Sequence, residues 1–242
     1  MVVIPARLQS TRLPGKVLAD IHGRPMLQHV YDRAKQSKLP AEVLIATDSE
    51  EVAQQASRWG AKAIMTSADC SCGTDRIASM VDQLDAEIII NVQGDEPMID
   101  PDLIDELGRL ALLSSADMVT PVVKITDPKV LISPTTVKVV VREDGTALYF
   151  SRSPIPFIRD AVPESWTEKN DFWLQVGTYA FRRNVLLEYR EWTESALEKM
   201  ERIEQLRFLE AGKTIQTFET HSHSMAVDTP EDLKTVREIM AP

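Results

Sequence analysis

Short apolar runs alternate with amphipathic stretches through the first half of this chain, and the alternation restricts the folds that it can adopt. We expect strands at residues 2–4, 42–46, 63–65 and 87–92. Between them apolar side chains recur at helical spacing, as in residues 26–34, which follow Pro25. Strands that alternate with helices are typical of a parallel sheet. The sequence therefore predicts an α/β fold of three layers with a mostly parallel central sheet.

Two aspartates stand where helices are expected to begin. Asp48, with Glu51 three residues further on, forms a capping-box pattern. Asp100 and Pro101 form a cap and first-turn pair for the helix that follows residues 87–92. Those residues are almost continuously apolar, which indicates a central strand covered on both faces.

The second half of the chain has a different pattern. Residues 137–151 predict an antiparallel hairpin, with Gly145 in its turn. Further expected elements are one strand at 172–181, one long helix at 195–211, strands at 214–219 and 225–227, and a last helix begun by Thr229 and Pro230. The sequence has no internal repeat or low-complexity linker. We therefore predict a single domain over residues 1–242, with an excursion at about 125–195 that includes the hairpin.

Charge and hydropathy exclude several classes of partner. The formal net charge is −10 and the pI about 5.0, so no general basic field would recruit nucleic acid. No run approaches the roughly 18 apolar residues that a membrane span needs, and residues 1–5 are too short for a signal peptide. We expect a soluble, cytoplasmic protein. Cys70 and Cys72 are expected to be reduced thiols, and His221 and His223 to be surface side chains.

The loop after the first strand is rich in cations. Arg7, Arg12 and Lys16 lie within ten residues, and Pro14 and Gly15 bend the chain before the last of them. Ligands of α/β sheets gather at the carboxyl ends of strands, where such a loop can surround a phosphate chain. The loop fits neither GxGxxG nor GxxxxGK[ST]. It predicts a site for a small anion, although three solvated surface cations are the alternative.

Acidic residues follow two later strands. The segment NVQGDEP, residues 91–97, places Asp95 beyond the strongest strand, and Asp100 is the better helix cap, which leaves Asp95 without a structural task. Asp228 follows the strand expected at 225–227, where it could also be a turn residue. Mg²⁺ prefers oxygen ligands and usually keeps substrate phosphates in its shell. If Asp95 and Asp228 converge, they form a metal site facing the cationic loop, as metal-dependent nucleotidyl transfer needs.

Eight segments, in order and covering essentially the whole chain, resemble the 3-deoxy-manno-octulosonate (Kdo) cytidylyltransferase family. They are IPARLQSTRLPGKVLADIHGRPMLQHVYDRA, ATDSEEVAQQA, MTS with CGTDRI, NVQGDEPMI, ALYFSRSPIPF, GTYAFRR, LEKMERIEQLRFLE and VDTPEDL. CMP-sialic acid synthetases share the opening loop but not NVQGDEP or YFSRSPIP. The resemblance implies a fold of the nucleotide-diphospho-sugar transferase type, in which the hairpin excursion serves dimerisation and the sugar site.

The resemblance also implies an activity. The family joins CTP and Kdo to give CMP-Kdo and pyrophosphate, with Mg²⁺ as cofactor, and so activates the sugar for lipopolysaccharide biosynthesis. A homodimer is the implied assembly. Glycosyltransferases that consume a nucleotide sugar share the layered architecture, but they are expected to carry an Asp-x-Asp site where this chain has Asp-Glu. A non-catalytic nucleotide-binding protein is a further alternative if the carboxylates do not converge.

Site residues follow from the resemblance position by position. Arg7, Lys16 and Asp95 are the implied catalytic residues, and Asp95 and Asp228 the implied metal ligands. The nucleotide side comprises Ala6, Arg7, Lys16, Gly73, Asp75 and Arg76. The sugar side comprises Gln93, Arg152, Gln175, Tyr179, Glu204 and Gln205.

Two positions depart from the family pattern. The family usually has His where this chain has Gln175, and it commonly has Ser where this chain has Cys72. Gln can donate and accept a hydrogen bond but carries no charge near neutral pH. The preferred sugar could therefore be a Kdo-related ulosonic acid, such as an 8-amino analogue.

Overall fold

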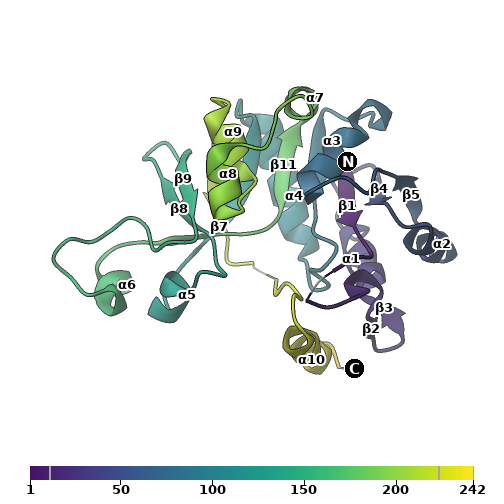
Figure 1. The fold of residues 1–242 in the computed structure, drawn as a ribbon, viewed down its shortest axis with the longest axis horizontal. Helices are drawn as coiled ribbons and strands as arrows, with labels where there is room; N and C mark the ends of the chain where they lie inside the picture. The colour runs from purple at the N-terminus through teal and green to yellow at the C-terminus, as the bar shows by residue number, and fades with distance from the viewer. Residues whose placement is uncertain (11, 223, 242) are drawn as a thin grey trace.

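The computed structural model describes residues 1–10, 12–222 and 224–241 of the chain. A large sheet runs through the molecule (Figure 1). Its strands are β1 (Val2–Ala6), β4 (Val43–Thr47), β5 (Lys62–Met65), β6 (Ile88–Asn91), β7 (Met118–Lys124), β8 (Lys138–Val141), β9 (Ala147–Ser151), β10 (Trp173–Gln175), β11 (Tyr179–Arg182) and β12 (Ile215–Glu219). They are ordered β5-β4-β1-β6-β11-β7-β10-β8-β9, and β12 pairs with β7.

The two halves of the sheet pair differently. β1 pairs in parallel with β4 and β6, and β4 with β5, as predicted from the alternating pattern. β11 then inserts antiparallel between β6 and β7, and β10 joins β7 to the predicted hairpin β8–β9. The carboxyl ends of β1 and β6 therefore reach the same edge of the sheet, where ligands of such folds bind.

Helices cover both faces of the sheet. On one face lie α1 (Met26–Ala34), α2 (Glu50–Arg58) and α4 (Pro101–Leu113); on the other lie α3 (Gly73–Ser79), α7 (Arg183–Tyr189) and α9 (Gln205–Glu210). Strand alternation explains the division, because Val2 and Ile4 of β1 pack on the first group and Val3 packs on the second. The predicted three-layer α/β fold is confirmed.

Smaller elements complete the chain. They are η1 (Lys16–Leu18), β2 (Asp20–Ile21), β3 (Arg24–Pro25), η2 (Val81–Gln83), α5 (Pro128–Ile132), η3 (Pro163–Ser165), α6 (Trp166–Lys169), α8 (Ala196–Glu201) and α10 (Pro230–Ile239). Figure 1 shows α5 and α6 projecting away from the sheet, where Ile125, Leu131, Trp166 and Phe172 form a small core of their own. No helix in the described ranges has both the length and the apolar composition of a membrane span.

Four details of the sequence prediction are wrong. Ser49, not Asp48, caps α2, because the Asp48 carboxylate accepts a hydrogen bond from Arg76. The strand expected at 172–181 is divided into β10 and β11, which pair with different parts of β7. The helix expected at 195–211 is divided into α8 and α9 at Arg202, whose φ of 56° is left-handed.

The fourth difference lies before the last helix. Residues 225–227 do not form a strand; Val227 N donates to Asp95 O instead (2.9 Å). Thr229 caps α10 as predicted, in a capping box with Asp232. His221 is exposed, as expected, whereas His223 lies outside the described residues.

The cap of α4 provides a test of this fold. Asp100 accepts a hydrogen bond from Asp102 N (3.0 Å) and another from Ser222 Oγ (2.7 Å), so it joins the helix to the segment before α10. We expect Asp100→Ala to lower the free energy of unfolding by about 1 to 2 kcal/mol in urea titrations. Asp102→Ala, an exposed first-turn control, should cost less than about 0.5 kcal/mol. Equal losses in both variants would contradict the assigned cap.

Candidate active site

A cavity of about 340 Å³ opens at the carboxyl edge of the sheet, between the loop after β1, the loop before α3 and the end of β6. It is lined by Pro5, Ala6, Arg7, Ser10, Arg12, Lys16, Val17, Cys70, Ser71, Cys72, Gly73, Arg76, Gln93, Gly94, Asp95 and Asp228. We call it the nucleotide-side cavity. Most of the residues predicted for the nucleotide and the metal meet here, although they come from four separate parts of the sequence.

Lys16 lies between two carboxylates at one end of this cavity. Its Nζ donates to Asp95 Oδ2 (2.5 Å) and to Asp228 Oδ1 (3.0 Å), and its side chain is only 13% exposed. Burial alone would lower the pKa of Lys16, but the charges and hydrogen bonds of Asp95 and Asp228 raise it above its ordinary value. Arg12 also donates to Asp228 Oδ1 (3.0 Å). Asp95 and Asp228 therefore converge, as the predicted metal site requires.

The two carboxylates fit a hard divalent cation. Both offer oxygen donors, and the bond from Val227 N to Asp95 O fixes the two segments next to each other. No group of three or more His, Cys, Asp or Glu side chains suited to a metal is found among the described residues. Two carboxylates would leave most of the coordination shell to water and phosphate oxygens, which is the usual pattern for Mg²⁺. The ligand role itself remains a prediction.

Glu96 has a different environment from its neighbour Asp95. It is 4% exposed, and its Oε2 accepts a hydrogen bond from Ser224 Oγ. Burial is the largest influence on this carboxyl and raises its pKa to about 7, against the hydrogen bond from Ser224 and with the charge of Asp95. Glu96 does not line the nucleotide-side cavity, so of these two neighbouring carboxylates Asp95 is the one that lines it.

The residues at the start of α3 have different contacts. Gly73 lies against β1, since a Cβ there would stand 3.1 Å from Pro5 Cγ. Arg76 lines the cavity, but its guanidinium donates to Asp48 (3.2 Å) and to Thr66 Oγ1 (2.5 Å). Asp75 is not among the lining residues.

Asp75 instead joins α3 to later helices. Its Oδ1 accepts hydrogen bonds from Tyr189 OH (2.9 Å) and Arg207 (3.0 Å), and Arg207 also forms a two-point ion pair with Glu198 (2.6 and 2.7 Å). Burial would raise the pKa of Asp75, but hydrogen bonds from Ser71 and Tyr189 and the charge of Arg207 lower it. In the structure Asp75 therefore holds the start of α3 in position through Tyr189 and Arg207. Its predicted contact with the nucleotide stays a prediction.

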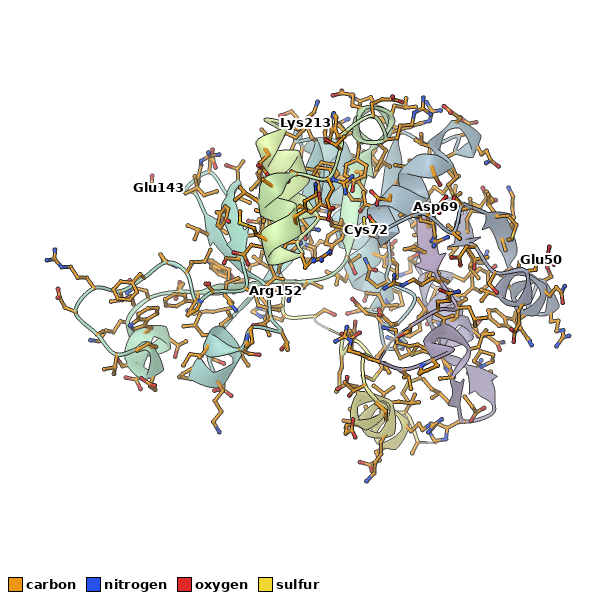
Figure 2. All side chains as sticks on the ribbon, in the orientation of Figure 1. Glu50, Asp69, Cys72, Glu143, Arg152 and Lys213 are labelled. Atoms are coloured by element: carbon orange, nitrogen blue, oxygen red, sulfur yellow. The ribbon has the colours of Figure 1, made fainter. Side chains whose placement is uncertain are left out.

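A second cavity, of about 330 Å³, adjoins the first. Every residue predicted for the sugar lines it: Gln93, Arg152, Gln175, Tyr179, Glu204 and Gln205. Ser71, Cys72, Gly73 and Gln93 line both cavities and form their common wall. We call the second one the sugar-side cavity. Figure 2 shows Cys72 near the middle of the molecule and Arg152 where the chain leaves for the projecting region.

Unused hydrogen-bonding groups line the sugar-side cavity. The amide nitrogens Nε2 of Gln175 and Gln205 are buried and have no hydrogen-bond partner within the described ranges. Burial raises the pKa of Glu204, whose carboxylate accepts a hydrogen bond from Thr74 N (3.4 Å). Buried amides without partners cost free energy, so a hydroxyl-rich ligand would stabilise this cavity.

The guanidinium of Arg152 is largely occupied by bonds within the protein. It donates to the carbonyl oxygens of Glu201 (2.7 Å), Pro134 (3.1 Å) and Arg202 (3.3 Å). These bonds tie the hairpin to the turn between α8 and α9. Direct contact between Arg152 and a sugar stays a prediction.

Sequence reasoning did not identify several residues of the site. Ser10, Cys70 and Ser71 line the nucleotide-side cavity, and Glu198 and Arg207 anchor the helices of the sugar-side cavity. For Glu198 a signal was present, because Ser195-x-x-Glu198 is a capping-box pattern and the structure forms that box. Ser10 and Arg207 lie within family segments, whereas Cys70 and Ser71 lie between MTS and CGTDRI and had no signal of their own.

Cys72 is the N-cap residue of α3. Its sulfur accepts a hydrogen bond from Asp75 N (3.3 Å), and burial raises the pKa of the thiol far above its usual range. Cys70 and Cys72 are both free thiols. Cys72 therefore acts as a structural cap in the common wall.

The environment of Glu96 predicts a pH dependence of stability. Because the pKa rises from 4.5 in the unfolded chain to about 7 in the folded protein, protonated Glu96 favours folding below about pH 4.5, and that contribution is lost as the pH rises to 7. Glu96→Gln imitates the protonated form. In urea titrations, the native protein should lose up to about 3 kcal/mol relative to Glu96→Gln between pH 4.5 and pH 8. A pH-independent difference would contradict the buried carboxyl assigned to Glu96.

Comparison with known proteins identifies the class of enzyme. Residues 1–215 match the protein family described as Cytidylyltransferase. The solved structure of a CMP:2-keto-3-deoxy-manno-octonic acid synthetase complexed with CTP superposes with a TM-score of 0.92 at 46% identity, covering 99% of this chain and 97% of its own. HddC from Yersinia pseudotuberculosis superposes with a TM-score of 0.68 at 14% identity, covering 98% of both chains, and shows the fold alone. The protein is a cytidylyltransferase.

Curated relatives identify the family of cytidylyltransferases to which the chain belongs. A 3-deoxy-manno-octulosonate cytidylyltransferase from Geobacter sulfurreducens is 46% identical over 246 residues, covering 98% of this chain and 97% of the relative. One from Solibacter usitatus is 46% identical over 239 residues, covering 98% and 92%. The chain belongs to the 3-deoxy-manno-octulosonate cytidylyltransferase family, which confirms the family predicted from the eight segments.

Proposed function

We propose that this protein transfers the cytidylyl group of CTP to Kdo, giving CMP-Kdo and pyrophosphate, with Mg²⁺ as cofactor. The observation that carries the proposal is the junction of the two cavities: a cluster of cations and carboxylates adjoins a cavity whose lining includes all six residues predicted for the sugar. Family membership and the likeness to a synthetase complexed with CTP support the same reaction. A glycosyltransferase is not favoured by any of these observations.

The cations of the nucleotide-side cavity are suited to the phosphates. Arg7 lies at the end of β1 and is exposed, so its guanidinium is available to a phosphate as a paired donor. Lys16 supplies a point charge in the same cavity. A triphosphate between them would place its reacting phosphorus near the common wall.

Charge development explains why these groups are needed. The anomeric hydroxyl of the sugar attacks the α-phosphorus in line, and negative charge grows on the phosphate oxygens as the bond to pyrophosphate breaks. Arg7 and Lys16 stabilise that charge more in the transition state than in the ground state. Mg²⁺ held by Asp95 and Asp228 would neutralise phosphate charge and lower the pKa of the attacking hydroxyl.

The sugar-side cavity would hold the acceptor with its hydroxyl directed at the common wall. Gln93 is oriented for this role, because its Nε2 donates to Gly177 O (2.9 Å) and leaves its side-chain oxygen toward Gly73. Gln175 and Gln205 offer amide donors to hydroxyl groups. Neutral Gln175 makes this contact independent of pH, and it leaves room for a Kdo-related ulosonic acid as the preferred substrate.

The proposal also covers the oligomeric state of the protein and the cellular location of the reaction. We expect a homodimer formed through the projecting region, which exposes Phe157 and Val162, with 74% and 63% of their surface accessible. Light scattering on a size-exclusion column should then give twice the chain mass of 27.2 kDa. The reaction would take place in the cytoplasm and supply lipopolysaccharide synthesis.

A single assay tests the activity. The protein is incubated with Mg²⁺, each of the four nucleoside triphosphates and Kdo, and pyrophosphate is measured. We expect release with CTP only, and only when both metal and sugar are present. Activity with a related ulosonic acid but not with Kdo would revise the substrate. No release with any of these acids would contradict the proposal.

Asp95→Asn tests the proposed metal site. The variant keeps the shape of the side chain but removes the charge, so turnover should fall by at least about a hundredfold. The thermal midpoint should change by only a few degrees, because Lys16 retains Asp228 as a partner. Asp102→Asn, an exposed control on α4, should keep full activity. A large loss of stability in Asp95→Asn would instead indicate a structural role.

A further inference from the structure

Lys16 stands where a metal ion would have to stand. The two oxygens nearest its Nζ, Asp95 Oδ2 at 2.5 Å and Asp228 Oδ1 at 3.0 Å, are the donors that converge on the nucleotide-side cavity. Mg²⁺ binds carboxylate oxygens at about 2.0 Å. An ion at that distance from both oxygens would overlap an ammonium group held between the same two atoms. One position cannot hold both cations.

The surroundings make this competition strong. The Lys16 side chain is largely buried, so water weakens its ion pairs less than it weakens those of a surface lysine. Its charge offsets one of the two carboxylate charges, and the exposed Arg12 is a further, solvent-screened partner of Asp228. Removal of the ammonium would make the electrostatic potential between the two carboxylates more negative, which favours binding of a divalent cation.

Lys16 also has a second place to go. It lies at the start of η1, after Gly15 in a left-handed conformation with φ 67°, and its flexible side chain lines the same cavity as Arg7. A triphosphate in that cavity offers the ammonium group several anionic oxygens. Lys16 can therefore exchange a carboxylate partner for a phosphate partner without movement of the backbone.

We propose that Lys16 competes with the divalent metal for Asp95 and Asp228, so that the metal binds tightly only once a triphosphate has drawn the ammonium group away. This inference rests on the proposed function of the site. It makes Lys16 both a phosphate ligand and a gate for the metal. The consequence is positive coupling between nucleotide and metal, and weak binding of free metal ions by the protein alone.

Arg12 is the matched comparison. It pairs with Asp228 alone, and the two side chains are 64% and 40% exposed, so it does not bridge the carboxylates and is well screened by solvent. Loss of Arg12 should alter the metal site far less than loss of Lys16.

The experiment is a titration with Mn²⁺ in the absence of nucleotide, with free Mn²⁺ measured by electron paramagnetic resonance. Lys16→Met should bind Mn²⁺ about tenfold more tightly than the native protein, the change expected from one partly buried ion pair. Arg12→Met should stay within about threefold of the native value. Lys16→Arg, which keeps a cation at the position, should bind more weakly than Lys16→Met.

A double variant locates the bound ion. Adding Asp95→Asn to Lys16→Met should abolish the gain in affinity. Unfolding curves monitor the fold of each variant, and Lys16→Gln replaces Lys16→Met if the latter does not fold. Equal or weaker Mn²⁺ binding by the Lys16 variant, or a gain that survives Asp95→Asn, would overturn the inference. Because no substrate is present, these outcomes are independent of the pyrophosphate assay that tests the proposed function.

Discussion

The close approach of the ends of β1 and β6 is the constraint on which the site depends. The two strands pair in parallel, and Gly94 follows β6 so near to β1 that a Cβ there would stand 2.9 Å from Pro5 O. Only glycine allows this approach, because the contact atom is backbone and cannot move aside. The approach brings Arg7 and Asp95 into the lining of one cavity, although they are 88 positions apart in the sequence. Without it, the cations and the carboxylates would not share a ligand.

Local sequence signals predicted the elements that carry this constraint. Apolar runs marked β1, β4 and β6, because strands buried on both faces need continuous apolar side chains, and a shorter apolar run marked β5 at the edge of the sheet. The position of Asp95 after such a strand indicated the edge of the sheet, and the convergence with Asp228 followed once the segment at Val227 bonded to it. The metal role of the pair is a matter of chemistry that the fold alone does not decide.

The helix expected at 195–211 is divided for a reason that sequence periodicity does not reveal. The residues Leu197, Met200, Ile203 and Leu206 recur at helical spacing across Arg202, so the pattern predicts one helix. The helix nevertheless ends at the left-handed Arg202, and Met200 is 71% exposed. The turn is stabilised from outside, by the bonds of Arg152 to the carbonyl oxygens of Glu201 and Arg202. Tertiary contacts of this kind override local propensity.

Tertiary contacts also determine the role of Asp75, and they fix the two cavities relative to each other. Its carboxylate belongs to the start of α3, but its partners Tyr189 and Arg207 come from α7 and α9, and Arg207 continues to Glu198 in α8. Removing one partner from such a half-buried network leaves a charge without compensation, so the network is stable only when complete. The loop of Ser71–Gly73 is therefore fixed to the helices that line the sugar-side cavity, not only to the nucleotide side. In the proposed reaction the two substrates must be aligned across this loop, so the network would act on the reaction through geometry, by fixing the position of the loop.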